Sequence, residues 1–126
     1  KTFKVNLMSF GFKYGLPADS DMVADARFIA NPHWKEALRK KTGNDKPVSD
    51  YVLSQPGVNE FLDTYLATLK TVLAGYRREN KRFATVAIGC TGGKHRSVAL
   101  TNHIAKLLSA DSEIQVAVSH RDLGRE

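Results

Sequence analysis

Residues 85–97 constrain the fold of this chain more than any other stretch. They begin with an apolar run at residues 86–88, which suits a strand buried on both faces of a sheet. Small residues follow at positions 89–93, and a helical pattern begins at Lys94. A strand, a glycine-rich turn and a helix N-terminus leave backbone N–H groups unpaired, with the positive end of the helix dipole behind them. The sequence therefore predicts an anion-binding loop.

The Walker A nucleotide-binding motif does not explain this loop. That motif requires four residues between its first glycine and the Gly-Lys pair, followed by Ser or Thr. Only three residues separate Gly89 from Gly93, and His95 stands where the magnesium-binding hydroxyl belongs. We therefore exclude a Walker A site here.

The spacing of the cysteine-phosphatase loop fits better. Cys90, five further residues, Arg96 and Ser97 match it, although Gly89 stands where a His often precedes the Cys. Loop amides and an Arg could lower a thiol pKa and make the sulfur a nucleophile. Three interpretations remain: an inert buried Cys in a glycine turn, a phosphate-binding loop without chemistry, and a catalytic nucleophile. We favour the second, because concave cationic loops bind anions more often than they react. The loop residues proposed to bind are Cys90, Thr91, Gly92, Gly93, Lys94, His95, Arg96 and Ser97.

Length and charge are typical of one basic globular domain over residues 1–126. Nineteen Lys and Arg and thirteen Asp and Glu give a formal net charge of +6. This charge favours nucleic acid or an acidic metabolite as a binding partner, but it is equally explained by solubility alone. A single Cys excludes an internal disulfide and favours a reducing cytoplasm. We see no signal peptide and no membrane-length apolar run, so we expect no membrane partner. A start at Lys1 instead of Met suggests a domain from a longer protein.

The rest of the chain alternates between strand and helix patterns. Apolar alternation or continuous apolar runs predict strands at residues 2–10, 22–28, 86–88 and 114–118. Helices are predicted at residues 47–53, 58–76 and 94–110, the second carrying a long i, i+3, i+4 apolar stripe. The strand–helix–strand order around residues 83–118 implies a right-handed crossover between parallel strands. We predict an α/β fold with a mainly parallel sheet and flanking helices.

Cationic side chains follow several of these strands. Lys13, His33, the loop from Cys90, and the pair His120 and Arg121 each lie just past a strand end. Each could be a solvated or structural group if it stood alone. Ligands of open α/β sheets collect at the carboxyl ends of strands, so the coincidence predicts one cationic pocket for a small phosphorylated or polycarboxylate molecule.

Two other features have structural explanations. Asp25 and Arg27 are two residues apart in a predicted strand, so they should share one sheet face and pair with each other or a neighbour. One Cys and scattered His residues give no metal-ligand spacing, and we predict neither a metal nor a cofactor.

The chain resembles the C-terminal domain of the RapZ/YvcJ family of bacterial RNase adapter proteins, also called nucleotide-binding proteins. The resemblance covers nearly the whole chain in the same order, through Ser9-Phe-Gly-Phe-Lys-Tyr-Gly-Leu-Pro17, Asp25-Ala-Arg-Phe28, Asn31-Pro-His-Trp34, Ile88-Gly-Cys-Thr-Gly-Gly-Lys-His-Arg-Ser-Val98 and His120-Arg121. It implies a sugar-phosphate-binding domain similar to part of phosphofructokinases. It also implies that ATP or GTP is bound and hydrolysed in an N-terminal P-loop domain outside this chain, so that this domain is not itself an enzyme.

The same resemblance implies ligands, partners and site residues. The family's enterobacterial members bind glucosamine-6-phosphate and small regulatory RNAs, present RNA to an endoribonuclease, and form homo-oligomers. The sugar-phosphate pocket would use Lys13, His33, Thr91, Gly93, His95 and Arg96, with Cys90 lining it. The tail Asp122-Leu-Gly-Arg-Glu126 departs from the basic enterobacterial tail, which predicts weaker RNA binding.

An enzymatic alternative stays open at this point. In it Cys90 is the nucleophile of a phosphatase-like reaction, Arg96 clamps the phosphoryl group, and Asp122 protonates the leaving group.

Overall fold

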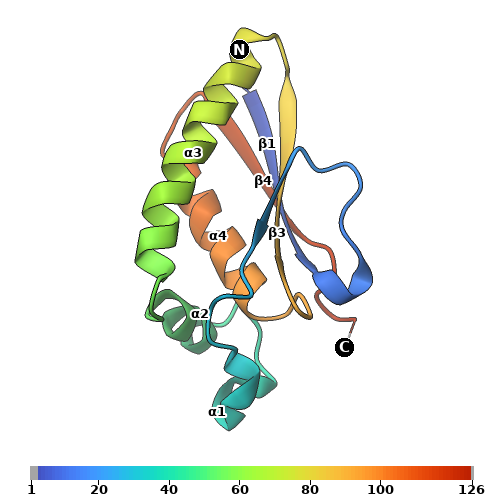
Figure 1. Ribbon diagram of the computed structural model, residues 1–126, viewed down its shortest axis with the longest axis vertical. Helices are drawn as coiled ribbons and strands as arrows, with labels where there is room; N and C mark the ends of the chain where they lie inside the picture. The colour runs from blue at the N-terminus through green and yellow to red at the C-terminus, as the bar shows by residue number, and fades with distance from the viewer. Residues whose placement is uncertain (1–2, 126) are drawn as a thin grey trace.

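An all-parallel sheet forms one layer of the molecule, and the helices form the other (Figure 1). The computed structural model describes residues 3–125. The strands are β1 (Phe3–Gly11), β2 (Met22–Asp25), β3 (Phe83–Cys90) and β4 (Ile114–His120), in the order β2-β3-β1-β4. All three neighbouring pairs are parallel, which confirms the predicted α/β class.

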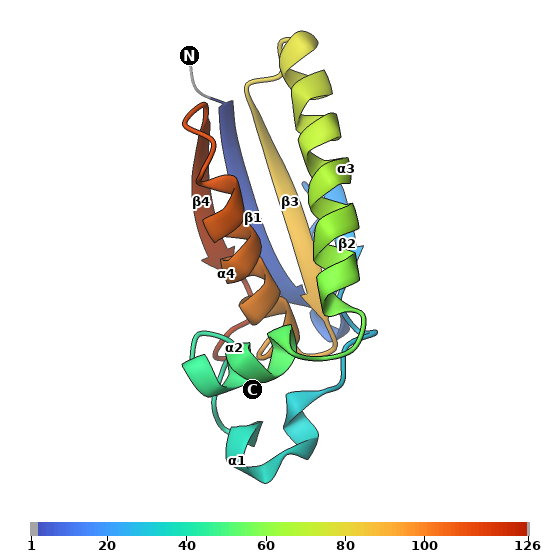
Figure 2. The ribbon, with the colours of Figure 1, turned by 90° about the vertical axis from the view of Figure 1, so that its left-hand side faces the viewer.

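The helices gather on one face and at one end of this sheet. The structure has α1 (Glu36–Arg39), α2 (Lys46–Leu53), α3 (Val58–Arg78) and α4 (Arg96–Leu108), with short 3-10 helices at Phe12–Tyr14 and Pro32–Trp34. Figure 2 shows α3 and α4 side by side over the same face, with α1 and α2 beyond the carboxyl ends of the strands. Within residues 3–125, no helix combines the length and the apolar character needed to cross a bilayer.

The core lies between this helical layer and the sheet. The stripe predicted on the long helix is confirmed, because Leu62, Leu69 and Leu73 of α3 are buried. Leu7 of β1 and Ile88 of β3 are fully buried in the same cluster. Burial of these apolar side chains holds the strand ends in fixed positions relative to α4.

Two details differ from the sequence predictions. The second strand ends at Asp25 instead of residue 28, because the N–H of Arg27 turns back to the Asp25 carboxylate. Arg27 therefore lies beyond the sheet, and the expectation that it shares a sheet face with Asp25 is wrong, although the two do form an ion pair at 2.8 Å. Helix α4 begins two residues later than Lys94. Thr2, the predicted start of the first strand, lies outside the described residues.

Glycine positions the β3–α4 loop against the end of β1. A Cβ atom on Gly11 would lie 2.5 Å from the carbonyl carbon of Gly92, so the two backbones touch directly. Gly93 has φ of +77°, and a Cβ there would lie 2.7 Å from the Gly11 nitrogen. On the other side of the loop, a Cβ on Gly43 would lie 2.4 Å from the His95 carbonyl oxygen. The loop is therefore packed between two backbone segments.

We expect Gly11→Ala to destabilise the protein by about 3 kcal/mol or more, because the added methyl group must displace backbone atoms. Urea denaturation followed by circular dichroism measures the change. Gly75→Ala in α3 is the control: its Cβ would meet only the end of the Arg78 side chain, at 3.6 Å. That helical substitution should stabilise by about 0.5–1 kcal/mol. Equal stability of the two variants would contradict the packing argument.

Candidate functional site

A cavity of about 280 Å³ opens at the carboxyl ends of the strands, where the anion-binding loop was predicted. No aspartate, glutamate or large aliphatic side chain of the described chain lines it. Its lining residues are Lys13, Asn31, His33, Arg39, Lys40, Cys90, Thr91, Gly92, Lys94, His95 and Arg96.

The β3–α4 loop is fixed through its carbonyl groups and leaves its amides unused. The carbonyl oxygens of Thr91, Lys94 and His95 accept hydrogen bonds from the N–H groups of Lys13, Gly43 and Ala99. In the part of the chain that the structure describes, the N–H groups of residues 91–96 donate no hydrogen bond. The N-terminus of α4 also has no side-chain cap. The loop therefore keeps unpaired donors at the positive end of a 13-residue helix, which is the arrangement that binds phosphate.

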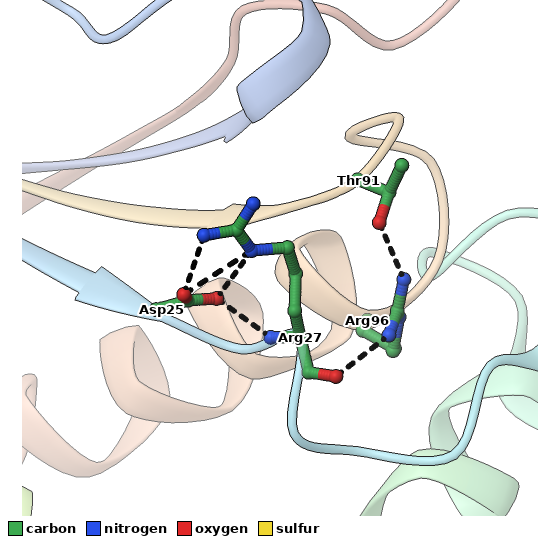
Figure 3. Close-up of polar contacts among 4 residues, drawn as sticks. All are labelled: Asp25, Arg27, Thr91 and Arg96. Atoms are coloured by element: carbon green, nitrogen blue, oxygen red, sulfur yellow. Dashed lines mark hydrogen bonds and ion pairs between the residues drawn. The ribbon is translucent and has the colours of Figure 1, made fainter.

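Arg96 places a buried positive charge behind this loop. Its side chain lines the cavity, and the residue is only 5% exposed. Nη1 donates to the carbonyls of Ile29 (3.0 Å) and Arg27 (3.3 Å), and Nη2 donates to the Thr91 hydroxyl at 3.3 Å (Figure 3). Nε has no partner among residues 3–125. Part of the guanidinium thus holds the chain from Arg27 to Ile29, and an unpaired buried donor remains.

The Asp25 carboxylate is engaged outside the cavity. Arg27 donates to it through Nε and Nη2, and this hydrogen bonding lowers the pKa of Asp25 (Figure 3). The Arg27 guanidinium also lies 3.9 Å from the centre of the Phe12 ring. This ion pair neutralises Asp25, the last residue of β2. The Asp25 carboxylate therefore does not compensate the positive charge of the cavity.

His95 connects the loop to α1. It is 6% exposed, and its Nε2 lies 3.1 Å from the carbonyl oxygen of Arg39, so Nε2 carries the donated proton. Burial lowers the pKa of His95, and the nearby charges of Lys94 and His33 lower it further. Arg39 in turn donates from Nε to the His33 carbonyl at 2.7 Å. His33 and Arg39 belong to what we call the outer wall of the cavity, and these two bonds hold that wall against the loop.

Cys90 lies at the base of the cavity and is 2% exposed. Its sulfur accepts a hydrogen bond from the Ser97 N–H at 3.3 Å and lies 3.1 Å from the Ser97 hydroxyl oxygen.

The structure brings eight of the predicted binding residues into the lining: Lys13, His33, Cys90, Thr91, Gly92, Lys94, His95 and Arg96. The other four, Gly93, Ser97, His120 and Arg121, do not line the cavity. Gly93 supports the loop against β1, and Ser97 contacts the Cys90 sulfur, as described above.

His120, Arg121 and Asp122 have structural contacts instead. His120 bridges the Ser9 hydroxyl and the Asn102 side chain, and Arg121 donates to the Gly15 carbonyl. The buried carboxylate of Asp122 accepts from the Gly11 N–H at 2.7 Å and pairs with Arg121. Asp122, the acid of the enzymatic alternative, therefore lies outside the cavity lining.

Three lining residues were not predicted: Asn31, Arg39 and Lys40. Arg39 is the last residue of α1 and Lys40 follows it directly; this four-residue helix is too short for a periodic pattern. The available signal was the basic run at residues 39–41, which only the fold places beside the loop.

Known proteins match this chain over nearly its whole length. Residues 3–124 match the family model described as the RapZ C-terminal domain. A nucleotide-binding protein of Mycobacteroides abscessus is 62% identical over 122 residues, covering 97% of this chain and 40% of that protein. Proteins of the same name from Paenarthrobacter aurescens and Clavibacter michiganensis are 59% and 62% identical over 99% and 98% of this chain. The chain spans about two-fifths of the length of these relatives.

One buried and two half-buried histidines predict how stability depends on pH. Burial lowers the pKa of His95, His103 and His120 below the unfolded value of 6.5, so the unfolded chain binds protons more readily than the folded one. The free energy of unfolding should therefore be highest at neutral pH and fall as the pH drops below 6.5. Urea denaturation between about pH 7.5 and about pH 5 measures this slope. His95→Gln and His120→Gln should each flatten it, and unchanged slopes in both variants would contradict the assignment.

Proposed function

Because the chain belongs to the RapZ C-terminal domain family, we propose that its cavity binds a phosphorylated metabolite, without chemistry, and signals the bound state to a partner. Glucosamine-6-phosphate, the ligand implied by the resemblance to enterobacterial members, is the amino-sugar phosphate we propose first. The observation that carries this proposal is that, in the described chain, the amides of five lining residues are unpaired and the Nε of the buried Arg96 has no partner. These residues are Thr91, Gly92, Lys94, His95 and Arg96.

The proposed pose follows from these donors. The phosphate would accept hydrogen bonds from the loop amides, with Lys94 and Arg96 supplying positive charge. The sugar would extend toward Asn31 and His33 on the opposite wall. A cavity of about 280 Å³ is close to the lower end of the range for small-molecule sites, which suits a compact metabolite.

Partners are proposed for the longer protein. The relatives are named nucleotide-binding proteins, and we propose that ATP or GTP is bound in the part that this chain does not span. A small regulatory RNA, an endoribonuclease and further copies of the chain are the proposed partners, in the cytoplasm. Asp122 pairs with both Arg121 and Arg125, so the tail offers little charge to RNA.

Calorimetric titration with glucosamine-6-phosphate tests the metabolite proposal. We expect saturable binding at millimolar ligand or below, and we expect Lys94→Gln to weaken it about tenfold or more, because hydrogen bonds to charged groups contribute about 1.5–3 kcal/mol. Lys106→Gln is the matched control, since it removes the same charge from the exposed last turn of α4. An absence of heat with folded protein would count against the proposal, as would equal weakening by both variants.

A phosphatase-like activity is the second candidate. It is supported by the contacts of the Cys90 sulfur with the N–H and hydroxyl of Ser97 and by the position of that sulfur at the base of the cavity. It is disfavoured because Asp122 lies outside the lining and Arg96 is partly bound to backbone carbonyls.

An aryl phosphate assay separates the two candidates. We expect no turnover above that of Cys90→Ser, a substitution that keeps the side-chain shape while removing the sulfur nucleophile. Turnover that Cys90→Ser abolishes would make the domain an enzyme and reverse our preference.

A further inference from the structure

We propose that Arg39 and Lys40, on the outer wall of the cavity, form a second anion-binding subsite. The preferred ligand would then carry a second anionic group in addition to its phosphate. This inference rests on the proposed function, in which the loop amides hold the phosphate. It changes the chemical class of the tightest-binding ligand to a phosphorylated sugar acid or a sugar bisphosphate, which should bind more tightly than glucosamine-6-phosphate, whose only anionic group is its phosphate.

The charge of the lining exceeds what one phosphate balances. Besides Lys13, whose ammonium also lies over the Tyr14 ring, Arg39, Lys40, Lys94 and Arg96 supply four positive charges around one small cavity. A phosphate monoester carries about −1.5 to −2 at neutral pH. Since no carboxylate of residues 3–125 lines the cavity, about two of the four positive charges stay unbalanced when a single phosphate binds.

Arg39 is oriented to receive an anion. Its Nε donates to the His33 carbonyl at 2.7 Å, which restricts the side chain. Neither Nη1 nor Nη2 donates a hydrogen bond to any other described residue, so the end of the guanidinium stays available. That end presents parallel N–H donors whose spacing matches a carboxylate or a phosphate. The bond from His95 to the Arg39 carbonyl holds this wall against the phosphate loop.

Lys40 is not neutralised by the surrounding acids. Asp45 accepts from the Thr42 N–H, and Asp50 pairs with Lys46. Glu36, one turn before Lys40 in the chain, makes no ion pair with it in the described structure. Lys40 therefore lines the cavity, and its ammonium has no carboxylate partner within residues 3–125.

The two subsites lie on different elements, so a ligand must span them. The amides belong to the loop between β3 and α4, whereas Arg39 and Lys40 lie at the end of α1 and just after it. The cavity has the volume of roughly nine liquid waters, which leaves room for a short carbon body between two anionic ends.

Two matched ligands test the subsite by calorimetry at low salt. Glucose 6-phosphate and 6-phosphogluconate share the phosphate and six carbons, and only the second carries a carboxylate at the other end. We expect 6-phosphogluconate to bind about tenfold tighter or more, as a charge-assisted pair allows. Lys40→Gln should remove most of this difference and leave the affinity for glucose 6-phosphate nearly unchanged. Arg39→Gln should also reduce the difference, but it breaks the bond to the His33 carbonyl and should weaken both ligands to some extent.

Lys41→Gln is the matched control, because Lys41 is the exposed neighbour that does not line the cavity. It should keep the full preference for 6-phosphogluconate. Lys40→Gln is the decisive variant, because within residues 3–125 the Lys40 side chain makes no contact that the fold requires. A melting temperature equal to that of the wild type confirms that the variant is folded.

The possible failures are distinct. Equal affinity for the two ligands would overturn the second subsite and leave the proposed function in place. The same conclusion follows if 6-phosphogluconate binds tighter but Lys40→Gln and Arg39→Gln do not change the preference. No binding of either ligand or of glucosamine-6-phosphate would overturn both proposals.

Discussion

The site depends on direct contact between the backbone of Gly11, at the end of β1, and the backbone of Gly92 in the loop after β3. Parallel pairing brings Gly11 level with Cys90, and the absence of side chains lets the loop fold across the strand end. The buried Asp122 carboxylate binds the Gly11 N–H at the same point and fixes the tail there. The loop is held by hydrogen bonds to the carbonyl oxygens of Thr91, Lys94 and His95, so within residues 3–125 its amides stay unpaired.

The cavity stays positively charged because three arginines near it have different partners. Arg27 neutralises Asp25, which is the acid closest to the end of β2. Arg96 is buried and is stabilised by the carbonyls of Arg27 and Ile29, which compensate part of its desolvation. Among the described residues, Arg39 bonds to a carbonyl through Nε alone, and its Nη1 and Nη2 donors have no partner. The result is a cavity whose field favours anions before any ligand arrives.

Most of the fold could be predicted from residue patterns, because the long elements carry strong periodic signals. The stripe on α3 and the apolar run of β3 are examples, and both are buried as expected. The end of β2 and the start of α4 were misplaced by two or three residues, since local turn bonds such as Arg27 N–H to Asp25 decide where an element stops. The 3-10 turn at Pro32–Trp34 and helix α1 have too few residues to show a period.

The sequence by itself determined the α/β class, the position of the glycine-rich loop between β3 and α4, and the family, because each is written in contiguous residues. Only the tertiary structure decided which cations share the cavity. It placed Arg39 and Lys40 opposite the loop, and it directed His120 and Arg121 into structural contacts although they follow a parallel strand. The physical reason is that side-chain partners come from segments distant in the chain, such as Ser9 for His120 and Gly15 for Arg121, and no local pattern encodes them.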